Sequence, residues 1–385
     1  MMIILYISIT FLLYTSVILI RNMFDFKPLK KTRVSEAPIS KKVSICIPAR
    51  NEVDVIERCV TSALKQNYPN FEVLVLDDQS TDGTSEILDQ LSGIINNLNH
   101  IKGSSKPDDW LGKPWACHQL SKKASGDILF FIDADVWLDE DVVPKAVSEL
   151  STFDAITVWP EQIVETFWER QVIPLIYFAL FTLLPAKYVE RDPRWLPKEL
   201  QSKMSPLFAA ACGQFIGFNK NCYDLIGGHQ SVKNKIIEDV DLAKNLKVSG
   251  ASFKMLHGAD SVFCRMYSNH NELWNGLRKN FFVGFNKNLP FFLSMGILHL
   301  IVFIAPIILF IHGFSINSSE LLIASSVAIF IIFIQRSLLN FIFKWDIYSA
   351  CTHALGVLWF QALGVQCLVD FFSKKTVQWK GRDLS

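Results

Sequence analysis

Apolar residues are concentrated at the two ends of this chain, and this distribution limits the folds that it can adopt. Met1 to Ile20 contains no charged residue, and residues 289–372 are mostly apolar. Half of the 385 residues are hydrophobic and 30 are Phe, which is too apolar for a typical soluble protein. We therefore expect membrane segments at both ends of one globular domain. The predicted parts are an N-terminal anchor (1–22), a globular domain (41–285), C-terminal membrane segments (289–372) and a basic tail (373–385).

The charges next to the first apolar segment predict its orientation. Basic residues follow this segment rather than precede it: Arg21, Lys27, Lys30, Lys31, Arg33, Lys41 and Lys42. A cleaved signal peptide carries its positive charges before the apolar core, so an uncleaved anchor is favoured. Positively charged flanks stay on the cytoplasmic side. We expect a multi-pass protein of the cell membrane whose globular domain is cytoplasmic.

The number of C-terminal spans stays open. Residues 172–185 are apolar over only about 14 positions, whereas a crossing needs roughly 20, so an interfacial or re-entrant helix or a core helix is expected there. Phe291–Ile311 is a good span, and Leu321–Ile334 is one only if it extends to Phe343. Tyr348–Phe372 is long enough but polar in places. Three full spans would place Lys374 and Lys375 outside, so we expect a partial segment or an exception to the charge rule.

Composition also excludes some classes of function. The net charge of +1 argues against a nucleic-acid-binding protein. The eight cysteines form no Cys-x-x-Cys pair, which fits reduced thiols in a cytoplasmic domain without a zinc site or disulfide framework.

Strand and helix patterns alternate in the first half of the globular domain. Residues 43–48 and 71–76 read as strands, and helical periodicity follows at 55–64 and from Ser85. A later strand includes Phe130 to Ile132. This alternation predicts an α/β fold with a doubly wound, mainly parallel sheet. Polar clusters follow three of the strands, where such sheets bind ligands: Arg50 to Glu52, Asp77 with Asp78, and Asp133 with Asp135.

Asp133 and Asp135 end the apolar run that begins at Leu129. Alternation along a strand places both carboxylates on the same side, where they repel each other unless a cation lies between them. Mg²⁺ or Mn²⁺ is the simplest cation, and such ions commonly join carboxylates to phosphate oxygens. A solvated acidic loop is the alternative. The chain has no Gly-x-Gly-x-x-Gly or Walker A sequence, so a metal and basic side chains have to neutralise any phosphates.

The order of these motifs, with Gly112-Lys113 between the second and third clusters, resembles the family 2 glycosyltransferases. That resemblance implies a GT-A type nucleotide-sugar domain between N- and C-terminal transmembrane helices. It also implies that Asp133 and Asp135 hold the metal, that Asp77 or Asp78 holds the base and ribose, and that Glu52 lies near them. The residues expected to bind the nucleotide sugar are Pro48, Arg50, Glu52, Asp77, Asp78, Lys113, Asp133, Arg265 and Arg278.

Later motifs resemble the carotenoid- and hopanoid-associated branch of this family. They include Gly213 to Lys220, Gly227 to His229, Phe263 to Tyr267, and Trp379 to Arg382. The resemblance implies that Asp239 is the catalytic base of an inverting transfer, with Glu238 as the second choice. The alternative is that Glu238 and Asp239 only stabilise the N-terminus of a helix, where negative charges are favourable. The processive relatives' Gln-x-x-Arg-Trp is absent, which argues against a polysaccharide synthase.

We therefore expect a metal-dependent inverting glycosyltransferase. It would move a hexosyl group from a nucleotide sugar, with UDP favoured, to a membrane lipid acceptor. A carotenoid or other terpenoid hydroxyl or carboxylate is the favoured acceptor, and a polyprenyl phosphate or glycolipid is the alternative. Arg278 is expected to bind either the diphosphate or a lipid headgroup, and His257 to be structural. A non-catalytic membrane scaffold on a degenerate transferase fold remains a different possibility. The sequence does not predict an oligomeric state.

Overall fold

The computed structural model describes residues 1–33, 41–94, 97–373, 378–380 and 382–383. They form two compact units, each treated by itself below. The sheet unit comprises residues 26–163 and 186–266, and the helical unit comprises residues 1–25, 164–185 and the chain from 267 onward. Residues 164–185 and 267–285 therefore group with the helices. The predicted limits of the catalytic domain, 41–285, stay a prediction.

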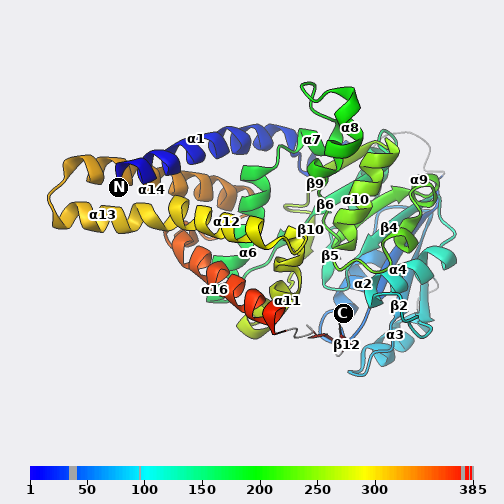
Figure 1. Cartoon of the computed structure of the whole chain (residues 1–385). Coiled ribbons are helices and arrows are strands. Elements are labelled where there is room, and N and C mark those ends of the chain that lie inside the picture. Colours follow the sequence, from blue (N-terminus) through cyan, green and yellow to red (C-terminus); the bar gives the residue numbers. More distant parts are fainter. Residues whose placement is uncertain (34–40, 95–96, 374–377, 381, 384–385) are drawn as a thin grey trace. The chain divides into compact units, whose positions relative to one another are not determined.

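A seven-stranded sheet forms the centre of the sheet unit (Figure 1). Its order is β3-β2-β1-β4-β8-β6-β9, and only β8 runs against the others. The strands are β1 (Val43–Ala49), β2 (Phe71–Asp77), β3 (Leu98–Lys102), β4 (Ile128–Ile132), β6 (Ala155–Trp159), β8 (Phe215–Asn219) and β9 (Phe253–His257). The predicted doubly wound, mainly parallel sheet is confirmed. A small sheet of β5 (Val136–Leu138), β10 (Val262–Cys264) and β7 (Glu161–Gln162) lies in the same unit.

Helices connect the strands, and their apolar faces bury the sheet. They include α2 (Ile56–Leu64), α3 (Thr84–Ser92), α4 (Gly112–Lys123), α5 (Val142–Leu150), α9 (Lys220–Leu225) and α10 (Glu238–Ser249). β1 and β4 are buried along almost their whole length, as expected for central strands covered on both faces. Ile45, Val75 and Phe130 lie in the resulting core.

Two details of the strands differ from the prediction. β1 continues through Pro48 to Ala49, because the pairing with β4 has already ended at Cys46 and Pro48 pairs only with Leu76 of β2. A proline that lacks an N–H is tolerated where one side of the strand is no longer paired. β3 was not predicted.

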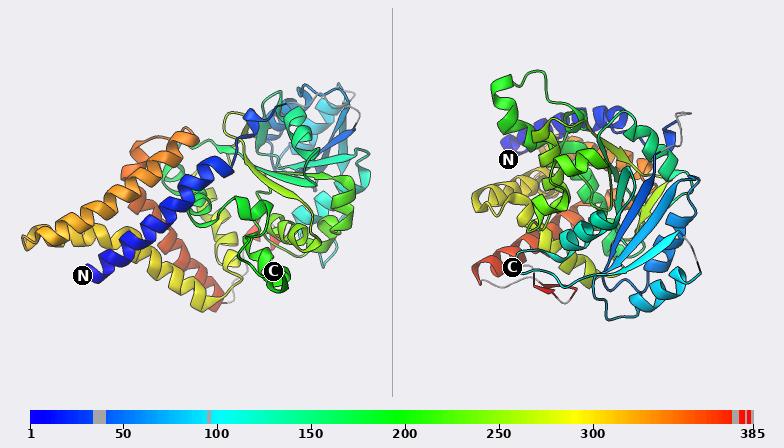
Figure 2. Two further views of the ribbon diagram at one scale, coloured as in Figure 1. Left: turned by 90° about the horizontal axis from the view of Figure 1, so that it is seen from above. Right: turned by 90° about the vertical axis from the view of Figure 1, so that its right-hand side faces the viewer.

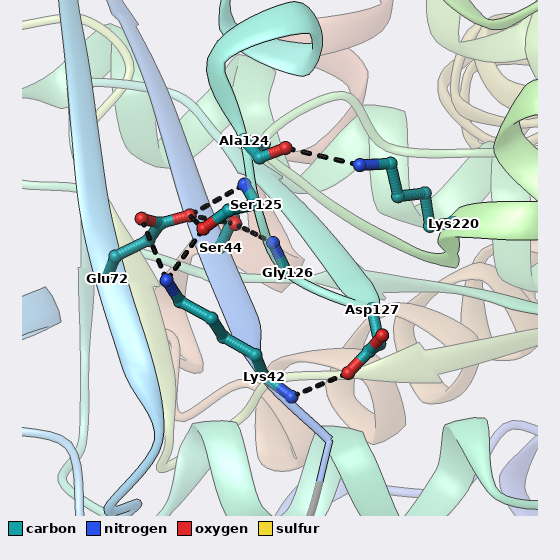
Figure 3. A network of polar contacts seen from close by, with 8 residues as sticks. All are labelled: Lys42, Ser44, Glu72, Ala124, Ser125, Gly126, Asp127 and Lys220. Carbon is teal, nitrogen blue, oxygen red and sulfur yellow. Dashed lines mark hydrogen bonds and ion pairs between the residues drawn. The ribbon is translucent and has the colours of Figure 1, made fainter.

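The end of the sheet opposite the acidic clusters is held by a half-buried carboxylate on β2 (Figure 3). The Glu72 carboxylate accepts hydrogen bonds from the Ser44 hydroxyl at 2.6 Å and from the Ser125 N–H and hydroxyl, both at 2.8 Å. The Lys42 ammonium lies 3.3 Å away. These bonds join the beginnings of β1 and β2 to the turn that leads into β4.

The helical unit contains α1 (Met2–Asp25), α6 (Phe167–Leu183), α11 (His270–Phe281), α12 (Leu289–His299), α13 (Ala305–Ser315), α14 (Ser319–Ile342), α15 (Tyr348–Cys351) and α16 (His353–Phe372). A short π-helix, Leu300–Ile304, joins α12 to α13. In Figure 2 the blue α1 lies against the orange α14. The Gln335 amide of α14 donates to the Leu12 carbonyl of α1 at 2.8 Å, which helps to fix this pair.

Four helices among the described residues are long and apolar enough to cross a membrane: Met2–Asp25, Leu289–Ser315, Ser319–Ile342 and His353–Phe372. The predicted apolar segments thus form helices, and the segment from Tyr348 breaks at Thr352. The orientation in the membrane stays a prediction. Lys374 and Lys375 lie outside the described residues.

Candidate active site

The site begins where β4 ends in the Asp-x-Asp sequence. The Asp133 N–H donates to the Gln214 carbonyl at 3.2 Å, and the Asp133 carbonyl accepts from the Val136 N–H at 3.1 Å. A short turn therefore carries Asp133 and Asp135 between β4 and β5. The Cys264 thiol of β10 is hydrogen-bonded to Asp135 and accepts from the Gln214 amide at 2.9 Å. Both carboxylates are thus held by elements that the fold brings to this edge.

Lys113 lies between two acidic groups from distant parts of the chain. It is in the first turn of α4, and its ammonium is 2.7 Å from Asp133 Oδ1 and 3.1 Å from Glu238 Oε1. Burial would lower the pKa of Lys113, but the charges of Asp133 and Glu238 outweigh it and hold the pKa well above its ordinary value. Lys113 is therefore a permanent cation that joins the Asp-x-Asp turn to α10.

Asp239 is in the first turn of α10, next to Glu238. The Gly213 N–H donates to Asp239 Oδ2 at 2.7 Å, and the Val240 N–H donates to Oδ1 at 2.9 Å. A Cβ at position 213 would lie 3.1 Å from the Lys113 ammonium and 3.2 Å from Asp239 Oδ2. A glycine is therefore what lets the backbone approach both groups so closely.

Burial, followed by the charge of Glu238, raises the pKa of Asp239 to about 7, although Lys113 and the two backbone N–H groups act in the opposite direction. A carboxyl group with such a pKa suits proton transfer at neutral pH. The helix N-terminus alone would lower the pKa, so burial and the charge of Glu238 outweigh it at Asp239. The interpretation of these acids as charges that stabilise a helix N-terminus stays an alternative.

These groups line one small pocket. Its lining includes Pro48, Lys113, Asp133, Gly213, Glu238 and Asp239. Five residues singled out from the sequence therefore meet at the C-terminal edge of the sheet, although they come from β1, α4, the end of β4 and α10.

The acidic groups around this pocket suit a divalent cation. Lys113 is the cation that lies beside Asp133 and Glu238 and that also acts on Asp239. The negative charges of Asp133 and Asp135 act on Cys264 as well. Burial and then these two carboxylates raise the pKa of the Cys264 thiol well above its ordinary value. Among the described residues, no group of three or more His, Cys, Asp or Glu side chains could hold a metal by itself. Two carboxylates fit Mg²⁺ or Mn²⁺ when diphosphate and water oxygens complete the shell.

The loops after β1 and β2 are tied together beside the pocket edge. The Arg50 guanidinium donates to the carbonyls of Asp78 and Gln79. The Glu52 N–H donates to the Thr84 hydroxyl at 2.8 Å, and Asp77 Oδ1 accepts from the Ser80 N–H at 3.0 Å. Arg50 therefore holds the loop that carries Asp77 and Asp78, and both of these acids are buried.

The remaining predicted residues lie elsewhere. Arg265 follows β10 in the sheet unit. Arg278 belongs to α11 of the helical unit and forms a bidentate ion pair with Asp370 of α16. Its role as a ligand of the diphosphate or a headgroup stays a prediction. His257 packs edge-on against Phe26, with ring centroids 5.6 Å apart, as a structural residue would.

His229 is a pocket residue that was not singled out as a site residue from the sequence. Its ring faces the pocket, and its Nδ1 lies 2.8 Å from the Tyr223 hydroxyl, which also accepts the His229 backbone N–H at 3.0 Å. Burial, together with Lys113, lowers the pKa of His229 to about 3, so the ring is neutral. The only sequence signal was the preceding Gly-Gly pair, whose positive φ angles allow this turn.

Comparison with known proteins shows what the sheet unit resembles. Residues 44–226 match the sequence model of the family described as "Glycosyl transferase family 2". This part of the chain is similar to glycosyltransferase family 2 domains. The resemblance inferred from the motifs is thereby confirmed.

Similar proteins extend this result beyond the family 2 domain. The 4,4'-diaponeurosporenoate glycosyltransferase of Staphylococcus aureus (strain USA300) is 25% identical over 359 residues, covering 90% of this chain and 88% of that protein. The protein of the same name from Staphylococcus haemolyticus is 25% identical over 271 residues, covering 69% of this chain and 68% of that protein. A solved structure, the mannosyltransferase PcManGT from Pyrobaculum calidifontis in complex with GDP-Man and Mn²⁺, is similar with a TM-score of 0.51 at 16% identity, over 97% of this chain and 99% of that one. This last similarity concerns the fold.

Proposed function

We propose that this protein is an inverting, metal-dependent glycosyltransferase that moves a hexosyl group from a nucleotide sugar to a lipid acceptor in the membrane. The observation that carries the proposal is the single pocket in which Lys113, Asp133, Glu238 and Asp239 meet. A helix terminus or a solvated acidic loop does not require these groups to lie together beside a partly buried carboxyl group of raised pKa.

In this proposal, Asp133 and Asp135 would hold Mg²⁺ or Mn²⁺, which would neutralise the donor diphosphate. The mannosyltransferase of similar fold was solved with GDP-Man and Mn²⁺, which supports a metal and a nucleotide sugar as partners. Lys113 provides a second positive charge beside Asp133. The loops that carry Glu52, Asp77 and Asp78 would bind the base and ribose. UDP is the favoured nucleotide on the family resemblance.

Asp239 would accept the proton of the acceptor hydroxyl while the acceptor oxygen attacks the anomeric carbon. The bond from that carbon to the diphosphate oxygen breaks, and the nucleoside diphosphate leaves with the electron pair. A carboxylate acceptor would need no proton transfer. Glu238 is the second candidate for the base. Its contact with Lys113 fits a role in holding the ammonium.

A carotenoid or other terpenoid is the favoured acceptor. Both staphylococcal relatives are named for a carotenoid-type acid, and the four apolar helices would keep the enzyme next to such a lipid. The alternative is a polyprenyl phosphate or glycolipid. A multi-pass protein with a cytoplasmic catalytic domain is the topology that we propose from the basic flank of the first helix.

The test compares Asp239→Asn with Glu238→Gln in the purified protein. We expect Asp239→Asn to abolish transfer to a hydroxyl acceptor while nucleotide-sugar binding in Mn²⁺ persists, because the binding groups stay in place. Glu238→Gln should retain part of the activity. An active Asp239→Asn with an inactive Glu238→Gln would reverse the assignment of the base. Absence of Mn²⁺-dependent donor binding by the unmodified protein would instead support the scaffold interpretation.

A further inference from the structure

One surface of the sheet unit combines exposed large apolar residues with unpaired cations. It belongs to the α7–η2 segment, residues 187–208, which contains α7 (Lys187–Glu190), α8 (Lys198–Met204) and the 3₁₀-helix η2 (Ser205–Phe208). Trp195, Leu200 and Leu207 are 62%, 44% and 72% exposed. Isolated exposed apolar residues are ordinary, but three large ones within 13 positions call for a partner.

The exposed apolar side chains project from an ordered support. Val189 and Leu196 are buried, and the Phe208 ring packs against Tyr188 at 5.4 Å and Trp195 at 6.4 Å. Trp195 is therefore exposed even though the segment around it is packed.

The acidic residue Asp192 of this segment is paired within the sheet unit, whereas three of its basic residues are exposed. The Asp192 carboxylate accepts a hydrogen bond from the Ser205 hydroxyl and forms an ion pair with Lys247 of α10 at 3.2 Å. Its negative charge is therefore balanced by a cation of the same unit. Arg191, Arg194 and Lys203 are exposed, and none forms an ion pair with a described residue. Apart from Glu199, the exposed charges described in this segment are positive. A tryptophan and leucines beside unpaired cations are the composition of a surface that lies on anionic lipid.

The chain connects this segment directly to the helical unit. Three residues, 184–186, join the end of α6 to the start of α7 and span no more than about 14 Å. At its other end, residues 209–212 lead directly to Gly213, whose N–H holds Asp239, and η2 packs against α10. The same segment is thus linked to the helical unit and to the proposed base.

We propose that the α7–η2 segment lies on the anionic headgroup layer of the bilayer, with Trp195, Leu200 and Leu207 inserted at its boundary. The cations supply the attraction, and the apolar side chains set the depth. Lipid contact at this surface does not depend on the chemistry of sugar transfer, so its test is independent of the proposed function.

The test uses full-length protein in nanodiscs with nitroxide-bearing lipids. Cys351 is the exposed cysteine and is replaced by Ser, while the other seven are buried. A fluorophore is attached at Leu207→Cys or, as a matched control, at Leu225→Cys on α9, because Leu225 is 71% exposed in the same unit. We expect the lipid nitroxides to quench the label at 207 and not the label at 225.

The electrostatic part is tested by replacing Arg191, Arg194 and Lys203 with Gln. Quenching at 207 should decrease in this variant, and it should also decrease in nanodiscs of uncharged phosphatidylcholine. Equal quenching at 207 and 225 would overturn the proposal. So would a label at 207 that is shielded from aqueous iodide but not quenched by lipid, since a protein partner or second copy would then cover the surface. A cooperative thermal unfolding transition, matching that of the unlabelled protein, verifies that each labelled protein is folded.

Discussion

At the residue scale, proton transfer depends on how the pocket distributes charge around Asp239. Lys113 contacts Asp133 and Glu238, while Asp239 is held by two backbone N–H groups. The ammonium thus pairs with the two flanking acids, while the partly buried Asp239 is repelled by the negative charge of Glu238. This arrangement leaves Asp239 as the acid that most readily keeps or accepts a proton.

The pH dependence of transfer should report this carboxyl group. Because the pKa of Asp239 is raised to about 7, we expect kcat/KM with a hydroxyl acceptor to rise with pH and to level off above about 7. Glu238→Gln removes a neighbouring negative charge, so the midpoint should move to lower pH. An initial-rate series over pH measures both midpoints, and a profile that does not rise between pH 5 and pH 8 would contradict the assignment.

Thermal unfolding provides the matching control. A carboxyl group whose folded-state pKa lies above its unfolded value stabilises the fold only while it is protonated, so its contribution is lost as pH rises from about 4 to 7. Asp239→Asn cannot ionise and should therefore unfold at a higher temperature than the unmodified protein at pH 8. The same variant should be inactive toward a hydroxyl acceptor.

The sequence predicted the acids of this site but not the groups that hold them. Asp133 and Asp135 stood out because two carboxylates at the end of an apolar run require an explanation, and the family resemblance implied Asp239. Gly213 and Cys264 lie in two of the later motifs, but they act through a backbone N–H and a buried thiol, and the motifs do not predict these contacts. Their roles depend on β8 and β10 meeting the end of β4, which is a tertiary property.

At the element scale, the Glu72 contacts join three strand beginnings, and their loss should weaken the sheet. Burial raises the pKa of Glu72, but hydrogen bonds from Ser44 and Ser125 and the Lys42 charge together lower it. We expect Glu72→Gln to lower the free energy of unfolding by about 1–3 kcal/mol at pH 7. The difference should shrink as pH falls through the Glu72 pKa, because the native carboxylate then loses its charge too. Chemical unfolding at several pH values measures it.

Glu86→Gln is the matched control for this change. Glu86 is exposed on α3 and has no described partner, so its replacement should alter the stability by less than about 0.5 kcal/mol. Comparable losses for Glu72→Gln and Glu86→Gln would mean that the Glu72 contacts contribute little.

Most elements followed from sequence patterns, and the exceptions have local causes. Hydrophobic runs ending in turn residues predicted β1, β2 and β4. β3 is an edge strand with the sequence Leu-Asn-His-Ile-Lys. Its polar residues interrupt the hydrophobic pattern by which a strand is predicted. The apolar segment from Tyr348 gave no sign of the break at Thr352, because nothing in its hydropathy marks it.

At the scale of the whole molecule, the chain enters the helical unit three times and the sheet unit twice. Residues 164–185 leave the sheet unit between β7 and α7, and they join the unit of the terminal helices. Hydropathy found this segment, but a run too short to cross a bilayer could not show which unit it belongs to. That assignment comes from contacts made far away in sequence.

Donor binding should stabilise the two units unequally. All the groups that we propose to bind the nucleotide sugar, apart from Arg278, belong to the sheet unit. At about a hundred times the Kd, a ligand that binds only the folded state adds roughly 2.7 kcal/mol. We therefore expect UDP-sugar with Mn²⁺ to slow amide hydrogen exchange in β1 and β4 by up to about a hundredfold, with little change in α13 and α14.

Chelation of the metal and the pair of substitutions Asp133→Asn and Asp135→Asn are the controls. Each should remove the protection of β1 and β4, because the diphosphate would lose the cation that balances its charge. Equal protection of α13 and α14 would show that the two units unfold together. It would also support Arg278, in the helical unit, as a ligand of the donor. Protection that survives in EDTA would instead show that Lys113 and the loop contacts bind the nucleotide without a metal.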